Sequence, residues 1–169
     1  MDKSDLLMEL SKEELVDLLH TAGKDFWNVQ GNWIYWVENT YGLDKAGEAD
    51  EAIFGPVAKA QTHRVKTLFD LGDDVQALIR SLKLVTYTYG AIQPEFRDVD
   101  DKGVSLYITK CGQDIRKSHG RDELPCKKAG LACFINHAQV INPKFKTSCL
   151  FCPPDEHPDD AWCAWRFEL

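Results

Sequence analysis

All six cysteines of this 169-residue chain lie between positions 111 and 163. Disulfide frameworks are typical of small secreted domains that cannot build a sufficient core. A chain of this length buries roughly 70% of its unfolded surface and does not need such a framework. Clustered thiols in a reducing compartment are more typical of a zinc or iron–sulfur site, because thiolates are soft ligands. Reduced structural thiols and a redox pair are the alternatives.

The spacing of the cysteines favours a metal site near the C-terminus. Cys149 and Cys152 form a CxxC pair, a spacing that lets both sulfurs face one ion, at about 2.3 Å for zinc. Pro153 follows directly and restricts the chain, and Cys163 returns at the start of a predicted strand. Cys133 lies in an apolar segment and is interpreted as a small buried residue. We expect the metal ligands to come from Cys111, Cys126, Cys149, Cys152 and Cys163, with zinc favoured and an iron–sulfur cluster as the alternative.

Helical patterns dominate roughly residues 1–92. The run from Ser11 to Glu14 is a capping box, which predicts a helix start. Gly31 is expected to break or bend this helix, and Gly42 to end it. Further helices are expected over 44–54, 56–69 and 74–87, although the β-branched and aromatic string 85–89 could instead be a strand.

The pattern changes to strands in residues 93–169. Segments 96–99 and 104–108 flank a turn and predict a β-hairpin. A short basic helix is expected at 115–119 and a longer one after Cys126, followed by strands ending at Phe151 and spanning 162–169. Residues 1–169 are therefore predicted to form a single α+β domain, with N-terminal helices packed on a C-terminal antiparallel sheet.

Charge and hydropathy limit the partners. The net charge is −7, and an acidic chain repels the phosphate backbone, so we expect no nucleic-acid partner. The apolar runs are far shorter than the ~20 residues that span a bilayer, so no membrane association is expected. The N-terminus lacks a basic region followed by an apolar one, which predicts a cytoplasmic protein. The sequence does not indicate an oligomeric state.

Few residues suggest acid–base chemistry or ligand binding. Asp155 and His157 follow the CxxC pair and are the candidate proton-transfer groups. Trp33 and Trp36 belong to an aromatic group that could wall an apolar pocket, and Arg64 is the candidate polar contact. The chain contains no glycine-rich phosphate loop, Ser/His/Asp motif or HExxH motif, so nucleotide use is unsupported.

The most specific motif is Cys149-x-x-Cys152-Pro-Pro-Asp155-x-His157-Pro, followed by Cys163-Ala-Trp-x-Phe167. Together with 10–15 and 31–33, it resembles an uncharacterised prokaryotic family. That family is distantly similar to aminothiazoline-carboxylate hydrolase-like proteins and to the vinyl-reductase-type small-molecule-binding domain. The resemblance implies a helical cap and an antiparallel sheet enclosing a small-molecule pocket, with a cysteine site near the sheet end. A Glu-x-x-Arg of the family stands here as Gln61-x-x-Arg64, so an acid–base role for that glutamate does not carry over.

These observations together favour a metal-thiolate protein that binds a small organic ligand. If the protein is an enzyme, the expected activity is hydrolysis of a small heterocyclic or sulfur-containing amide, with an open zinc site polarising the carbonyl. The first alternative is a non-catalytic ligand-binding or sensing module with a structural zinc. The second is an iron–sulfur protein with an electron-transfer or sensory role.

Overall fold

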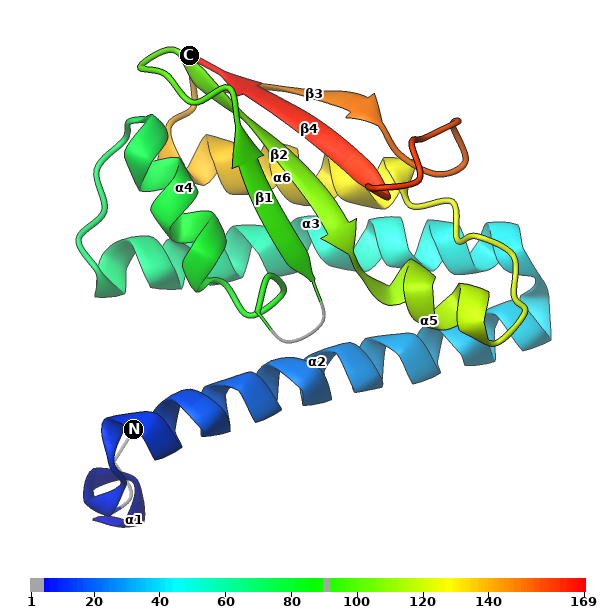
Figure 1. The fold of residues 1–169 in the computed structure, drawn as a ribbon, viewed down its shortest axis with the longest axis horizontal. Coiled ribbons are helices and arrows are strands. Elements are labelled where there is room, and N and C mark those ends of the chain that lie inside the picture. The colour runs from blue at the N-terminus through cyan, green and yellow to red at the C-terminus, as the bar shows by residue number, and fades with distance from the viewer. Residues whose placement is uncertain (1–4, 90–91) are drawn as a thin grey trace.

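The computed structural model describes residues 5–89 and 92–169. The elements in chain order are α1 (Asp5–Glu9), α2 (Lys12–Tyr41), α3 (Leu43–Leu68), α4 (Val75–Leu84), β1 (Gln93–Arg97), β2 (Gly103–Lys110), α5 (Gly112–Ser118), α6 (Lys127–Ile141), β3 (Lys146–Phe151) and β4 (Cys163–Glu168). The strands form one antiparallel sheet in the order β1-β2-β4-β3. The sheet packs against α6, which packs in turn against α3, and α4 lies at one end (Figure 1). The predicted α+β class is confirmed.

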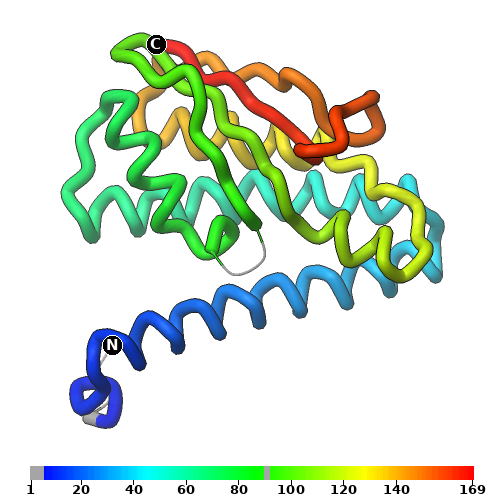
Figure 2. The backbone as a smooth tube through the Cα atoms, in the orientation of Figure 1, coloured from blue at the N-terminus to red at the C-terminus, as the bar shows by residue number. Residues whose placement is uncertain are grey.

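Helix α2 begins and ends where the sequence predicts. The Ser11 hydroxyl accepts a hydrogen bond from the Glu14 backbone at 3.2 Å, and the Glu14 carboxylate accepts one from the Ser11 backbone at 2.8 Å. Gly42 ends the helix with φ of 95°, which glycine adopts without strain. The expected break at Gly31 is wrong, because one glycine costs only about 1 kcal/mol in a helix interior and thirty residues of helix tolerate it. The N-terminal end of α2 projects away from the rest of the molecule (Figure 2).

Helix α3 replaces the two helices expected on either side of Pro56. Proline removes one hydrogen bond from the helix interior and costs about 3 kcal/mol there. Close packing along α6 compensates for this cost: a Cβ placed on Gly55 would lie 3.5 Å from the Cβ of Ala132. Ala58 and Thr62, further along the same face of α3, are fully buried.

The string 85–89 forms a turn, so both the extended helix and the strand expected there are wrong. Helix α4 ends at Leu84, and the Thr88 hydroxyl donates to the Val85 carbonyl at 2.8 Å. The side chains of Val85 and Tyr87 are buried in the core. The apolar character of this string therefore reflects burial and not strand formation.

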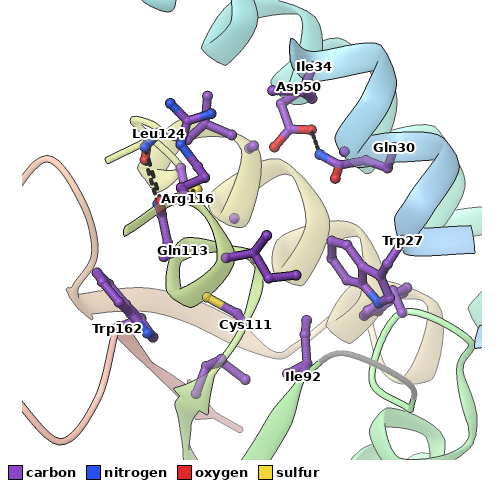
Figure 3. A pocket seen from close by; sticks show the side chains of 18 of the residues that line it. Trp27, Gln30, Ile34, Asp50, Ile92, Cys111, Gln113, Arg116, Leu124 and Trp162 are labelled. Carbon is purple, nitrogen blue, oxygen red and sulfur yellow. Dashed lines mark hydrogen bonds between the residues drawn. The ribbon is translucent and has the colours of Figure 1, made fainter. Parts of the chain in front are cut away.

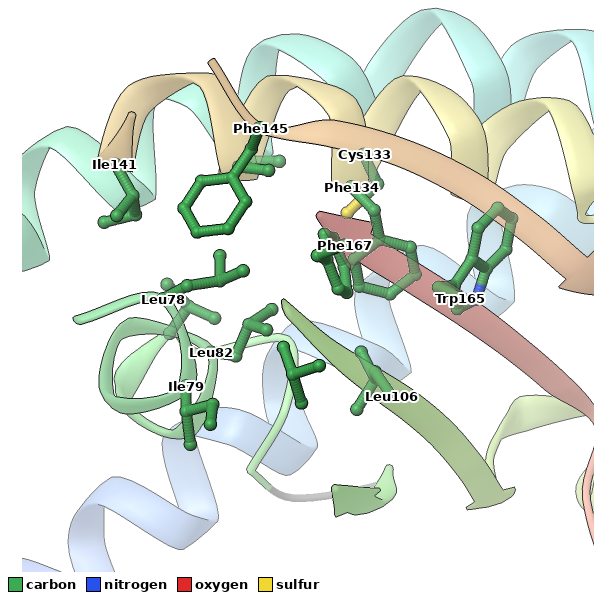
Figure 4. Packing of buried hydrophobic residues seen from close by; sticks show 14 of the residues in the cluster. Leu78, Ile79, Leu82, Leu106, Cys133, Phe134, Ile141, Phe145, Trp165 and Phe167 are labelled. Carbon is green, nitrogen blue, oxygen red and sulfur yellow. The ribbon is translucent and has the colours of Figure 1, made fainter. Parts of the chain in front are cut away.

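The core lies between the sheet, α4 and α6 (Figure 4). Leu106 on β2 is paired with Trp165 on β4, and both side chains are completely buried. Gly130 on α6 lies directly against the Trp165 indole, because a Cβ at this position would come within 2.4 Å of the Trp165 Cζ2 atom. In the part of the chain that the structure describes, no helix has the length and apolar character needed to cross a bilayer.

Candidate functional site

A cavity of about 910 Å³ lies between the helices and the ends of β2 and β4 (Figure 3). Helix α2 contributes Trp27 and Gln30 to its lining, and α3 contributes Asp50 and Phe54. The rest of the lining comes from α5, α6, the strand ends and several connecting turns and loops. This volume is within the range of pockets that hold small organic ligands, roughly 300–1,000 Å³.

Aromatic side chains form much of the cavity wall. The rings of Trp27 and Phe54 stack with centroids 5.8 Å apart and planes 27° apart. Trp162 lines another part of the wall. The Trp27 indole Nε1 is buried and has no hydrogen-bond partner within the described ranges. An indole N–H left unpaired in an apolar wall can donate to an acceptor atom of a bound molecule.

Five of the six cysteines line this one cavity, and all six are free thiols. The five are Cys111, Cys126, Cys133, Cys152 and Cys163. Cys149, which the sequence placed among the candidate ligands, lies on β3 outside the lining, whereas Cys133, interpreted from the sequence as a buried core residue, lies both in the core and in the lining. Four of the lining thiols stand where a strand or helix begins or ends. Because these ends meet in the fold, thiols from distant segments of the chain reach the same cavity.

Two of the lining sulfurs accept hydrogen bonds from N–H groups. The Trp165 indole donates to Cys163 Sγ at 3.2 Å. The buried Gln113 amide donates to Cys126 Sγ, also at 3.2 Å, and to the Leu124 carbonyl at 2.8 Å. Such donors favour the thiolate form over the thiol.

The ionisation of the thiols differs along the cavity wall. Burial raises the pKa of Cys111 to about 12 and that of Cys126 well above its ordinary value. Cys163 is the exception: hydrogen bonds from Cys152 and Trp165 lower its pKa despite its burial. The pKa of Cys152 is raised, first because it donates to Cys163. Cys163 therefore has the strongest thiolate character of the group, and Cys152 keeps its proton.

The sulfurs are not arranged as a metal site. Over residues 5–89 and 92–169, no group of three or more cysteine, histidine, aspartate or glutamate side chains is spaced to hold a metal ion. A cysteine sulfur moves by rotation about a single bond. The cysteine sulfurs are therefore chemically suited to a soft metal. Their present spacing is not that of a metal site, and side-chain rotation would be needed to bring them around one ion.

Asp50 is a buried carboxylate in the cavity wall that the sequence analysis missed. It is 5% exposed, and its Oδ1 accepts a hydrogen bond from Gln30 Nε2 at 2.7 Å. Burial raises its pKa to about 6, and the Gln30 hydrogen bond only partly opposes this. Asp50 lies four residues after Ala46 and four before Phe54, so all three share one face of the helix. The apolar neighbours on this face were the sequence signal that Asp50 points inward.

Arg116, on α5, forms a buried ion pair with Glu38. It is 4% exposed, and its Nη1 lies 2.7 Å from Glu38 Oε2. A second guanidinium nitrogen contacts Glu38 Oε1 at 3.1 Å, and Nε donates to the Asp122 carbonyl at 2.8 Å. The hydrogen bond from Arg116 lowers the pKa of Glu38. This bidentate pair fixes α5 against α2 and closes one side of the cavity.

A buried histidine supports Tyr87, another lining residue. The Tyr87 hydroxyl hydrogen-bonds to His137 Nδ1, and Ser81 Oγ lies 2.6 Å from His137 Nε2. Thr62 Oγ1 also lies 2.9 Å from His137 Nδ1, and Ser81 and Thr62 donate their own protons to the Leu78 and Ala58 carbonyls. Burial lowers the pKa of His137 to about 3, so this imidazole is neutral at pH 7.

The other residues predicted to form the site lie outside the cavity lining. Trp33 and Trp36 are 56% and 57% exposed on α2. Arg64 lies beside a separate shallow depression on α3. Asp155 forms an ion pair with Lys127 at 2.6 Å, and His157 packs on the Trp162 ring. The last two residues therefore lie near the cavity but not in its wall.

The fold and cavity define an α+β protein whose helices close a thiol-lined cavity against an antiparallel sheet. Residues 8–169 match the model of a family of unknown function, DUF6125, and the chain belongs to this family. The predicted membership of an uncharacterised family is thus confirmed. No curated protein and no solved structure matches the chain.

Proposed function

We propose that the protein binds a small organic molecule in the thiol-lined cavity. The observation that carries this proposal is the cavity itself, with its aromatic walls and a few inward-facing polar groups. The unpaired Trp27 Nε1 and the buried Asp50 supply polar contacts that would fix a ligand's orientation. The resemblance to vinyl-reductase-type small-molecule-binding domains supports the same function.

The tryptophans offer a direct test of this proposal. Trp27, Trp162 and Trp165 line the cavity, whereas Trp33 and Trp36 do not. We expect indole or benzyl alcohol, titrated into ¹⁵N-labelled protein, to shift the Nε1–H resonances of the three lining tryptophans and leave those of the other two in place. Equal shifts for all five, or none at millimolar concentration, would contradict the proposal.

A second proposal concerns the thiols, for which zinc is favoured and an iron–sulfur cluster is the alternative. Cys111, Cys126, Cys152 and Cys163 line one cavity, and N–H donors to two of their sulfurs resemble the outer-shell contacts that support metal-bound thiolates. The six free thiols also agree with a reducing compartment such as the cytoplasm. A zinc ion there could act as a Lewis acid toward a bound carbonyl. Hydrolysis of a heterocyclic or sulfur-containing amide rests on the family resemblance alone.

Metal content with two matched serine variants tests the thiol proposal. We expect stoichiometric zinc in protein purified without oxygen, loss of most of it in Cys163→Ser, and wild-type content in Cys149→Ser, because Cys149 lies outside the cavity. Iron with a visible charge-transfer band would favour the cluster instead. Wild-type protein without either metal would refute the thiol proposal and leave ligand binding unaffected.

A further inference from the structure

Asp50 places a negative charge inside the cavity wall without a positive partner. The Asp50 side chain is only 5% exposed, and its pKa of about 6 leaves it mostly ionised at pH 7. Its only hydrogen bond within the described ranges comes from the neutral amide of Gln30. A buried carboxylate is costly unless it is paired with a positive charge or several donors.

The groups around Asp50 do not neutralise it. The ion pairs formed by the described residues do not include Asp50, and the buried cation of α5, Arg116, is held by Glu38. Burial raises the pKa of Cys126, which caps the start of α6, and of Cys133 within α6, and the charge of Asp50 raises both further, so these nearby thiols are neutral. The carboxylate therefore has beside it an amide, neutral thiols and an arginine whose charge is already paired. Lys24 and Lys110 also line the cavity, but neither forms an ion pair with Asp50.

The wall beside Asp50 suits a flat, positively charged molecule. Phe54 lies one helical turn after Asp50 and stacks with Trp27. Aromatic faces attract cations within about 6 Å, and most strongly when the cation is shielded from water. The orphaned Nε1–H of Trp27 adds a donor for an acceptor atom on the same molecule.

We propose that Asp50 is the recognition group for a protonated nitrogen, so the cavity takes a small organic amine or amidine carried on a flat apolar body. This inference rests on the proposed small-molecule-binding function and names the class of ligand. The carboxylate would pair with the cationic nitrogen and the stacked Trp27 and Phe54 rings would face the apolar body. The ligand charge would supply the counter-ion that the protein itself does not provide.

Matched charged and neutral probes test this inference on the full chain. Benzamidine and benzamide have nearly the same shape but differ in charge, as do benzylamine and benzyl alcohol. From titrations followed by the indole Nε1–H resonances, we expect each cation to bind wild-type protein about tenfold more tightly than its neutral analogue, or ~1.4 kcal/mol. In Asp50→Asn, which keeps the side-chain shape, this preference should disappear while the neutral probes still bind.

A second acidic residue of the cavity rim provides the control. Asp114 on α5 is exposed, and its carboxylate accepts the Cys111 backbone N–H at 2.8 Å, which an asparagine oxygen can also do. Asp114→Asn should keep the preference for cations. Equal affinities of benzamide and benzamidine for the wild-type protein would overturn the inference and leave the binding function intact. If no probe shifts the lining indoles, both proposals fail.

Discussion

Replacing His137 with alanine is expected to lower the free energy of unfolding at pH 7 by about 3–5 kcal/mol. The ring is fully buried and pairs with Tyr87 and Ser81 through its two nitrogens. Alanine removes the hydrogen-bond partner of the Tyr87 and Ser81 hydroxyls and leaves a cavity where the ring packed. Urea denaturation followed by circular dichroism measures the loss.

His63→Ala is the control for this variant. His63 is exposed on α3, so its replacement should change the free energy of unfolding by less than about 0.5 kcal/mol. Equal losses for the two variants would show that the buried network does not stabilise the fold.

Asp50→Asn is expected to raise the free energy of unfolding at pH 7 by about 1–3 kcal/mol. The pKa of Asp50 is raised from 3.8 to about 6 by burial, so the folded state binds this proton more tightly than the unfolded state. The resulting stabilisation is complete below about pH 4 and is lost as the pH rises through 6. Asparagine carries no charge at any of these pH values, so the difference between the variant and wild type should vanish near pH 4. Denaturation curves at pH 4, 5, 6 and 7 measure this difference.

The pH profile separates the effects of Asp50 and His137. The pKa of His137 is lowered from 6.5 to about 3, so its contribution to stability is lost as the pH falls below 6.5. Between pH 6 and 4 the two effects oppose each other, at about 1.4 kcal/mol per pH unit each. Asp50→Asn should therefore lose stability on acidification more steeply than wild type. Glu51→Gln, which removes the charge of the half-buried neighbour on α3, should follow the wild-type curve, and a parallel curve for Asp50→Asn would contradict the buried-charge argument.

Local patterns predicted the elements whose causes are local. The Ser11 capping box, the Gly42 stop and the apolar residues that predict a strand over 104–108 each act within a few residues, and the helix start, the helix end and the strand all appear in the structure. Pro56 was assigned to a helix start because its cost is local, whereas the packing of α3 on α6 that offsets it joins residues about 75 positions apart. The string 85–89 was ambiguous for the same reason, since Tyr87 is held by a histidine fifty positions away.

The candidate site was predictable only in part. Element ends converge in a fold, so the positions of the cysteines pointed to a shared location for most of them. The aromatic residues of α2 divide between two sides of the helix: Trp27, with Ile34 seven positions later, lines the cavity, whereas Trp33 and Trp36 are mostly exposed to solvent. Which side of a long helix is covered depends on its neighbours, and the pattern of α2 alone, apolar over a broad stripe, did not specify it.

The contact between Gly130 and Trp165 links the interior of α6 to the chemistry of a sulfur atom. The indole can lie flush on the helix only because position 130 has no Cβ, and the same indole directs its N–H at Cys163. A bulkier residue at 130 would push the ring, and with it the donor, away from the sulfur. One of the hydrogen bonds that lower the pKa of Cys163 thus depends on the absence of a side chain at position 130, thirty-three residues earlier in the chain.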